Sequence, residues 1–264
     1  MKADSLEGHT AHYQRAGYRF ALHPDFSDAE KLMGLVLGEL EPERYFRKGR
    51  RRNVMLFDGM VVKLYAFRKL SDLLHSGRYA SREVECYHDY VKAFGSLAGF
   101  RLPKLMGYFE KPWLVRLYKV NGIVSEYIPD THELTLQELM LTVPLFAHLY
   151  RRGIYHPDMQ LKNILYQPGT RTVIPIDYMG TNILPAPSWE ALLIELAHIQ
   201  KMCKIPDEAG KPLVEAVLQA LPELHLAPQK AWRCITEIWR LTITTHQYHH
   251  PIFLPDSLRQ ETMP

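Results

Sequence analysis

The sequence predicts an α+β protein with two lobes, a β-rich N-terminal lobe and a helical C-terminal lobe. Short strand-like runs separated by turns dominate the chain up to Tyr127. Helix-compatible segments dominate from Trp189 onward, and no internal repeat or low-complexity linker intervenes. The division expected from this change is residues 1–127, an N-terminal extension with the β-rich lobe, and residues 128–264, the helical lobe.

The composition is that of an ordinary soluble globular protein. Of the 264 residues 47% are hydrophobic and 23% are charged, and the formal net charge is only +3, so no nucleic-acid partner is expected. Cys86, Cys203 and Cys234 are far apart, without the spacing of a zinc cluster or a disulfide framework. Neither a signal peptide nor a membrane-spanning segment is recognised, so a cytoplasmic location is expected.

In the first lobe, Val54–Phe57 and Met60–Tyr65 flank Asp58-Gly59, which predicts a β-hairpin with Lys63 on its second strand. A helix is predicted over 81–93. Strands are predicted at 102–108, 113–120 and 122–127.

In the second lobe, Thr135-Leu-Gln-Glu138 is a candidate capping box, followed by a helix over 145–152 that Gly153 ends. A hairpin is predicted from 163–167 and 172–177, joined through Pro168-Gly169-Thr170, with glycine permitting a left-handed corner. This hairpin would bring Asn163 near Asp177. Later helices are predicted at 189–202, 212–221 and 230–245.

The strongest motif is His156-Pro-Asp158-Met-Gln-Leu-Lys-Asn163-Ile-Leu, followed by Asp177-Tyr-Met-Gly180. It resembles the catalytic loop and metal-binding motif of protein-kinase-like enzymes, which implies a bilobal protein-kinase-like fold. Phosphoryl transfer needs a carboxylate to orient the attacking hydroxyl and oxygen ligands for Mg²⁺. The resemblance therefore implies Asp158 as the catalytic residue and Asn163 and Asp177 as metal ligands, while His156 braces the loop.

Further residues follow the same resemblance. Lys63 lies in a run similar to the strand that supplies the ATP-positioning lysine, and Glu83, preferred to Glu85, is similar to its acidic partner. Glu126 and Ile128 resemble a hinge whose backbone hydrogen-bonds adenine. ATP and Mg²⁺ are the cofactors that this reading implies.

The sequence departs from the kinase pattern at the nucleotide-covering loop. The single Gly49 replaces a glycine-rich motif, and Arg47–Arg52 holds five basic residues in six positions. Guanidinium groups there could contact ATP phosphates, an anionic acceptor or a lipid head group. Tyr178 stands where Phe is usual, and only a brief connection precedes the next helix, which argues against an ordinary protein kinase.

With these departures, the sequence resembles the bacterial lipopolysaccharide core kinase family. Its members phosphorylate heptose or Kdo sugars at the cytoplasmic face of the inner membrane. The resemblance implies an anionic sugar or glycolipid acceptor and peripheral membrane association. Three alternatives stay open: an aminoglycoside- or choline-type kinase, a RIO-like atypical protein kinase, and a pseudokinase that binds a partner or a lipid without turnover. The cluster His246–His250 is read as an exposed turn instead of a metal site.

Overall fold

The computed structural model describes residues 11–24, 26, 28–48, 52–66, 79–114, 117–156 and 158–241. The chain forms two compact units: a first unit, Met1–His88 with Pro103–Pro129, and a second unit, Asp89–Leu102 with Asp130–Pro264. The lobe boundary between residues 127 and 128 stays a prediction. The histidine cluster at 246–250 lies outside the described residues.

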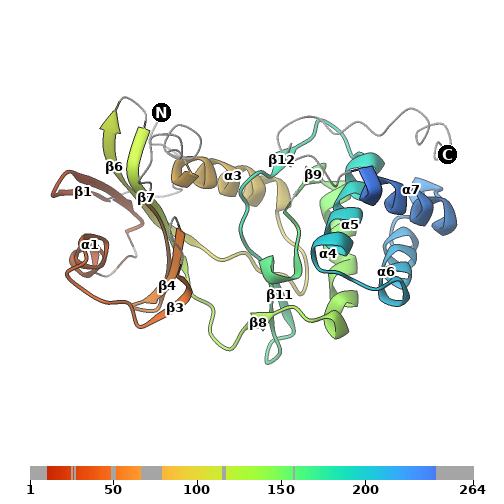
Figure 1. Ribbon diagram of the computed structural model, residues 1–264, viewed down its shortest axis with the longest axis horizontal. Coiled ribbons are helices and arrows are strands. Elements are labelled where there is room, and N and C mark those ends of the chain that lie inside the picture. Colours follow the sequence, from red (N-terminus) through yellow and green to blue (C-terminus); the bar gives the residue numbers. More distant parts are fainter. Residues whose placement is uncertain are drawn as a thin grey trace. The chain divides into compact units, whose positions relative to one another are not determined.

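The first unit is built on an antiparallel seven-stranded sheet with the strand order β1-β2-β6-β7-β5-β4-β3 (Figure 1). The predicted hairpin is confirmed, because β4 pairs with β5 and both Asp58 (φ 49°) and Gly59 (φ 69°) adopt the left-handed backbone of a tight turn. The strands are β1 Ala11–Arg15, β2 Tyr18–Leu22, β3 Arg44–Lys48, β4 Arg52–Phe57, β5 Met60–Ala66, β6 Leu105–Leu114 and β7 Leu117–Glu126.

The prediction of three strands between residues 102 and 127 is wrong. The structure has only β6 and β7, which form one long hairpin through residues 105–126. The predicted break between 113–120 and 122–127 is absent, because Gly122 lies inside β7 and pairs with Leu64 of β5. A glycine in a strand can mark a close backbone approach as well as a turn, and periodicity does not distinguish the two.

Two helices cover opposite faces of this sheet. Helix α1 (Ala29–Leu37) packs on the face that includes Phe20, Val62 and Val124. Helix α3 (Tyr79–Phe94) packs on the other face through Ala80 and Val84. Because side chains alternate along a strand, the burial of Val62 under α1 turns the next residue, Lys63, toward α3. Lys63 of β5 therefore faces α3, the helix that was predicted to carry the acidic partner of this lysine.

Gly122 is a position where this sheet accepts no side chain. A Cβ added there would overlap the ring of Phe109 and the backbone oxygen of Lys63. We expect Gly122→Ala to lower the stability by about 1–3 kcal/mol, as overpacking of a filled core does. Gly169→Ala is the matched control, since no atom lies within 4 Å of its added Cβ. Thermal melting of the two variants measures the difference, and equal melting temperatures would contradict the close contact.

The second unit is mainly helical, with short strands near its start (Figure 1). Together with the sheet of the first unit, this confirms the predicted α+β class. The helices are η1 Leu136–Thr142, α4 Val143–Arg151, η2 Leu161–Asn163, α5 Trp189–Met202, α6 Asp207–Gln219, η3 Pro222–Leu224 and α7 Pro228–Leu241. The strands are β8 His132–Glu133, β9 Ile154–Tyr155, β10 Ile164–Gln167, β11 Thr172–Pro175 and β12 Asn182–Ile183.

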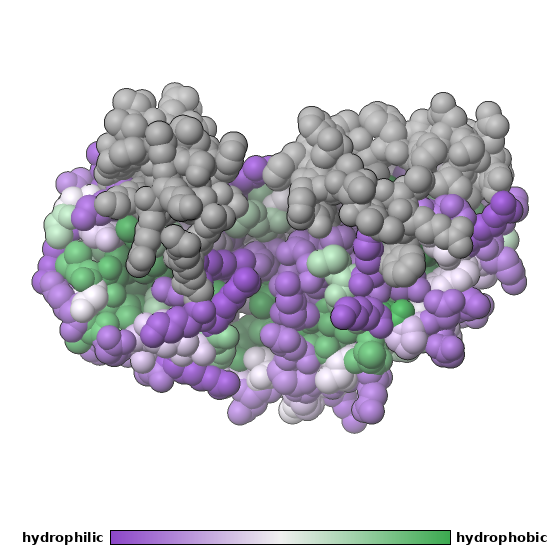
Figure 2. Space-filling view, in the orientation of Figure 1, coloured by the Kyte–Doolittle hydropathy of each residue, from purple (hydrophilic) through white to green (hydrophobic). Residues whose placement is uncertain are grey.

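Local sequence signals place most of these elements. The capping box at Thr135 and Glu138 is present, with the Thr135 N–H donating to Glu138 at 3.0 Å. Helix α5 has its predicted bounds, but α6 begins before the predicted Pro212, because Pro206 accepts the first helical hydrogen bonds and the proline sits inside the helix. Among the described helices, none is long and apolar enough to cross a bilayer. Hydrophilic residues cover much of the face drawn in Figure 2.

Candidate active site

A short loop between β9 and β10 carries Asp158 and Asn163. The Asn163 side-chain amide donates to the backbone oxygen of Asp158 at 2.9 Å and to its carboxylate at 3.1 Å. Gln160 donates to the other carboxylate oxygen of Asp158. Both oxygens of this carboxylate are thus held by loop amides, which fixes the direction in which the group can accept a further hydrogen bond.

The hairpin β10–β11 links the loop to Asp177. The Ile176 N–H donates to the backbone oxygen of Asn163 at 2.8 Å, so the residue before Asp177 is bonded to Asn163, as the predicted hairpin requires. Asp177 itself has φ 65°, a left-handed conformation that costs energy for a residue other than glycine. In the hairpin turn the left-handed residue is Arg171 (φ 53°), not the predicted Gly169.

Asp158 is ionised at neutral pH. Burial acts to raise the pKa of its carboxyl group, but the interactions with His198 and Gln160 outweigh burial, and the pKa lies below its usual value. The His198 Nε2 to Asp158 Oδ1 distance is 3.8 Å, an electrostatic contact that is too long for a direct hydrogen bond. A carboxylate with a lowered pKa is a weak base, so the group is suited to orienting a hydroxyl.

Helix α5 contributes a second, fully buried carboxyl group. Glu195 is 2% exposed and accepts the backbone N–H of His156 at the start of the loop. Burial raises the pKa of Glu195 to about 8, although the His156 N–H lowers it. The imidazole of His156 packs edge-on against Tyr90, and burial lowers the pKa of this histidine against the opposing effect of Asp177 and Asp158. The loop is therefore anchored by a neutral carboxyl group and a neutral imidazole.

This burial predicts a pH-dependent stability. An unfolded Glu ionises near pH ~4.3, whereas folded Glu195 holds its proton up to a pKa of about 8. Between these values folding takes up a proton, so the contribution of Glu195 to stability falls as pH rises, by at most about 1.4 kcal/mol per pH unit. We expect Glu195→Gln, which keeps an oxygen acceptor for His156, to remove this slope.

Chemical unfolding of both proteins from pH 5 to 8 measures the effect. The native chain should lose stability relative to Glu195→Gln across this range. Glu190→Gln, at a partly exposed position of the same helix, is the control and should follow the native profile. Parallel pH profiles for the native chain and Glu195→Gln would show that Glu195 is ionised in the folded protein.

In the first unit, Lys63 of β5 and Glu83 of α3 form a buried ion pair. Lys63 is 8% exposed and Glu83 is 1% exposed, and the ammonium group donates to one oxygen of the carboxylate. The Tyr65 hydroxyl donates to the other oxygen at 2.7 Å. Glu85 is exposed on the same helix. The structure therefore pairs Lys63 with the glutamate that the sequence favoured, and adds Tyr65 as a partner.

The other predicted nucleotide contacts lie at the end of β7 and beyond the described residues. The Glu126 N–H donates to the backbone oxygen of Lys104 at 2.8 Å, so this donor is engaged within the sheet. Ile128 is buried, with 4% of its surface exposed. Gly49 lies outside the described residues. A hinge role of Glu126 and Ile128 stays a prediction, with the Glu126 carbonyl as the group to consider.

The oxygen donors near the loop fit a magnesium ion in part. Within the described residues no cluster of three His, Cys, Asp or Glu side chains could hold a metal ion on its own. Mg²⁺ in phosphoryl-transfer sites needs only one or two protein carboxylates, because substrate phosphates and water complete its shell. Asn163 and Asp177, at the two ends of one bonded hairpin, are compatible with that requirement.

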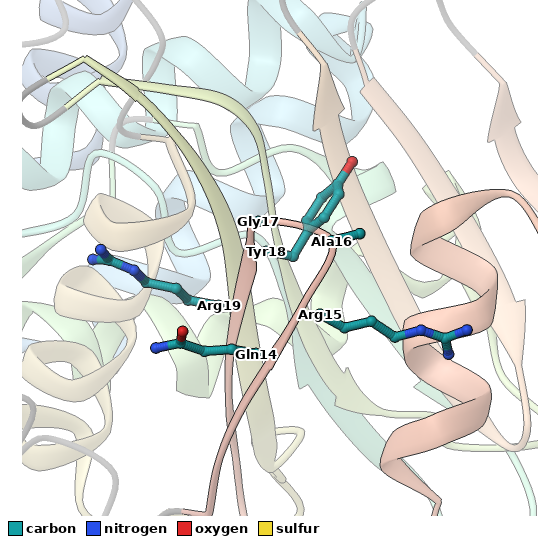
Figure 3. A pocket seen from close by; sticks show the side chains of 6 residues that line it. All are labelled: Gln14, Arg15, Ala16, Gly17, Tyr18 and Arg19. Atoms are coloured by element: carbon teal, nitrogen blue, oxygen red, sulfur yellow. The ribbon is translucent and has the colours of Figure 1, made fainter.

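The first unit has a pocket of its own. It is lined by Gln14–Arg19, the turn between β1 and β2 (Figure 3). Arg15 points away to Glu39 of the α1 region, with a 3.0 Å ion pair. The lining contains none of the predicted site residues and no carboxylate, so we assign it no role.

Three residues that hold the Asp158 loop, like Tyr65 beside Glu83, were not predicted from the sequence. Gln160 lies inside the recognised motif, and its amide contacts Asp158. Glu195 and His198 are three positions apart on α5, so both face the same side of that helix. The available signal was a glutamate and a histidine among Leu192–Ile199, a run that is otherwise apolar. Polar residues on a buried helix face need partners, which points to an internal role.

Comparisons with known proteins address the fold. No protein-family model matches the chain. A subtelomeric hrmA-associated cluster protein of Aspergillus fumigatus is 41% identical over 64 residues, which are 22% of this chain. The chain spans only 12% of that curated relative, so the match describes a small part of each protein.

Solved structures resemble most of the chain. WaaP, solved in complex with acyl carrier protein, matches with a TM-score of 0.54 at 14% identity, over 85% of this chain and 99% of WaaP. WbdD, described as a bifunctional kinase-methyltransferase, matches with a TM-score of 0.50 at 11% identity, over 76% of this chain and 51% of WbdD. The chain has a protein-kinase-like fold. In this kinase-like fold, the loop of Asp158 and the pair Lys63–Glu83 are the candidate functional groups.

Proposed function

We propose that the chain is an ATP- and Mg²⁺-dependent phosphotransferase whose acceptor is a sugar hydroxyl of lipopolysaccharide core or a related glycolipid. The observation that carries this proposal is the carboxylate of Asp158, ionised and held through both oxygens by Gln160 and Asn163. A preorganised carboxylate of this kind suits a reaction that depends on positioning more than on covalent chemistry.

Each residue has a distinct part in the proposed reaction. Lys63, held by the Glu83 carboxylate that also accepts from Tyr65, binds the ATP phosphates, and Asp158 orients the acceptor hydroxyl toward the γ-phosphorus. The acceptor oxygen forms a bond to phosphorus as the bond to ADP breaks, and the hydroxyl proton passes to Asp158 or to water. Mg²⁺ held by Asn163 and Asp177 would neutralise the phosphate charge. Glu126 and Ile128 would contact adenine, and Gly49 would lie at the phosphates.

The glycolipid acceptor is supported by the resemblance of the motifs and by the short connection between Asp177 and α5, which begins at Trp189. The basic run Arg47–Arg52 is suited to a highly anionic acceptor. Such an acceptor would be met in the cytoplasm, at the cytoplasmic face of the inner membrane. Because WaaP was solved with acyl carrier protein, that protein is a second candidate partner for this chain.

The test is transfer of labelled γ-phosphate from ATP, with and without Mg²⁺. The acceptor panel comprises lipopolysaccharide core, Kdo-lipid, an aminoglycoside, choline, acyl carrier protein and a generic protein. We expect metal-dependent labelling of a core glycan. Labelling of another acceptor would retain the phosphotransferase and replace the acceptor, whereas ATP binding with no labelled product would favour a pseudokinase.

A further inference from the structure

Among the described residues, strand β3 (Arg44–Lys48) is one of the two edges of the first unit's sheet, at the end of the strand order opposite to β1 (Figure 1). Its five residues, Arg-Tyr-Phe-Arg-Lys, are all exposed. We call these five residues the β3 strip. Two exposed aromatic rings on an edge strand need an explanation, because an exposed apolar edge is a site of unwanted association.

Each ring of the strip is accompanied by a cation of the same strand. The Arg44 guanidinium lies 5.2 Å from the centre of the Phe46 ring, and the Lys48 ammonium lies 4.7 Å from the Tyr45 ring. Phe46 is 43% exposed and Tyr45 is 36% exposed, although Phe46 also meets Tyr127 on one side. A bulge between Tyr45 and Arg47 interrupts the regular pairing with β4. Such a bulge discourages pairing with another strand.

The charge of the strip is of one sign. Residues 44–52 contain six Arg or Lys and no acidic residue. Within the described part of the chain, Arg44, Arg47 and Lys48 make no ion pair with a carboxylate. The nearest preceding acid, Glu43, accepts the Asp58 N–H at 2.6 Å. This concentration of positive charge repels a second copy of the same strip and attracts an anionic surface.

We propose that the β3 strip is a membrane-contact element that binds the surface of an anionic phospholipid bilayer. Cations near such a surface gain attraction to lipid phosphates, while aromatic rings settle at the boundary between head groups and acyl chains. Both requirements are met by side chains that the sheet leaves outside its core. Arg47 and Lys48 also belong to the basic run proposed for the acceptor, so vesicle binding is measured without ATP or acceptor and can fail or succeed independently of phosphoryl transfer.

The test is co-sedimentation of the full chain with vesicles of phosphatidylcholine, with and without 30 mol% phosphatidylglycerol. We expect binding only to the anionic vesicles, and its loss at high salt because the charges are screened. The variant Arg44→Gln/Arg47→Gln/Lys48→Gln should reduce partitioning about 100-fold, since each cation near the surface contributes about 1 kcal/mol, or about 5-fold. Folding should be retained, because these side chains are exposed; thermal melting checks this.

A charge-matched control is Lys92→Gln/Arg171→Gln/Lys230→Gln, which neutralises three exposed cations of the second unit. Both triple variants change the formal net charge from +3 to 0, by subtraction of three positive charges. Equal loss of binding in the two variants would overturn the proposal, because net charge alone would then explain it. Retained binding in the β3 variant, or equal binding to vesicles without anionic lipid, would also overturn it.

The aromatic contribution is tested at constant charge. Tyr45→Ala/Phe46→Ala should weaken binding to anionic vesicles at least 5-fold, whereas Tyr13→Ala/Leu40→Ala, at positions 39% and 42% exposed, should not. If the two pairs of substitutions weaken binding equally, the aromatic rings do not contribute and the strip is a general site for polyanions. Tighter binding to a DNA duplex than to the vesicles, lost in the β3 triple variant, would assign the strip to nucleic acid and overturn the lipid contact.

Discussion

Asp158→Asn is expected to lower kcat by about 100- to 10,000-fold, the range in which a positioned acid or base contributes to proton transfer. Asparagine keeps an oxygen that can accept from Gln160, and Asn163 keeps its bond to the backbone oxygen of residue 158, so the loop should keep its shape while the charge proposed to orient the acceptor is lost. Nucleotide binding should remain within a few-fold of the native value. Single-turnover transfer of γ-phosphate and titration with a fluorescent nucleotide measure the two quantities separately.

Asp207→Asn is the matched control, because Asp207 is exposed at the start of α6 in the same unit. It should leave both quantities unchanged. An Asp158→Asn protein with full kcat would remove Asp158 from the reaction. A large loss of nucleotide affinity would instead assign this residue to nucleotide or metal binding.

Asp177→Asn is expected to weaken Mg²⁺-dependent nucleotide binding at least 10-fold, because the neutral amide is a poorer ligand for Mg²⁺ than a carboxylate. Asparagine tolerates the left-handed backbone of this position, where φ is 65°, better than most residues do. The substitution therefore removes charge with little backbone cost. Isothermal titration with ATP in Mg²⁺ and in EDTA separates the metal-dependent part of the affinity.

Two comparisons make this result specific. In EDTA, native and Asp177→Asn proteins should bind nucleotide equally, since the metal contribution is then absent from both. Asp177→Ala should melt at a lower temperature than Asp177→Asn, because alanine meets the left-handed strain without a side-chain hydrogen bond. Equal Mg²⁺-dependent affinities in native and Asp177→Asn proteins would exclude Asp177 as a metal ligand.

Local patterns predicted the parts of the fold that depend on neighbouring residues. The Asp58-Gly59 turn fixed the hairpin β4–β5, and the capping box at Thr135 marked the start of η1. The predicted number of strands near Gly122 was wrong. The constraint at this position comes from the adjacent strand, where the ring of Phe109 leaves no room for a side chain. A contact between strands leaves no mark in the residues immediately around it.

In the candidate site too, residues close in sequence were predicted and residues brought together by packing were not. The spacing of Asp158, Asn163 and Asp177 was visible because these residues lie on one loop and one hairpin. The pairing of Lys63 with Glu83 came from a resemblance and is present in the structure. Tyr65, Glu195 and His198 were missed, since their contacts with the site residues depend on how a strand and a helix pack.

Helix α5 carries both Glu195 and His198, less than one turn apart, and each contacts a different end of the short segment His156–Asp158. A rotation or shift of this helix would therefore displace the Asp158 carboxylate and the backbone of His156 together. The position of the helix depends on the packing of its interior leucines Leu192, Leu193 and Leu196, which are at most 2% exposed. In a library of random variants, intolerance to substitution should extend from the motif into these leucines. Substitutions that reduce turnover should then fall in the buried face of α5 as well as in the motif.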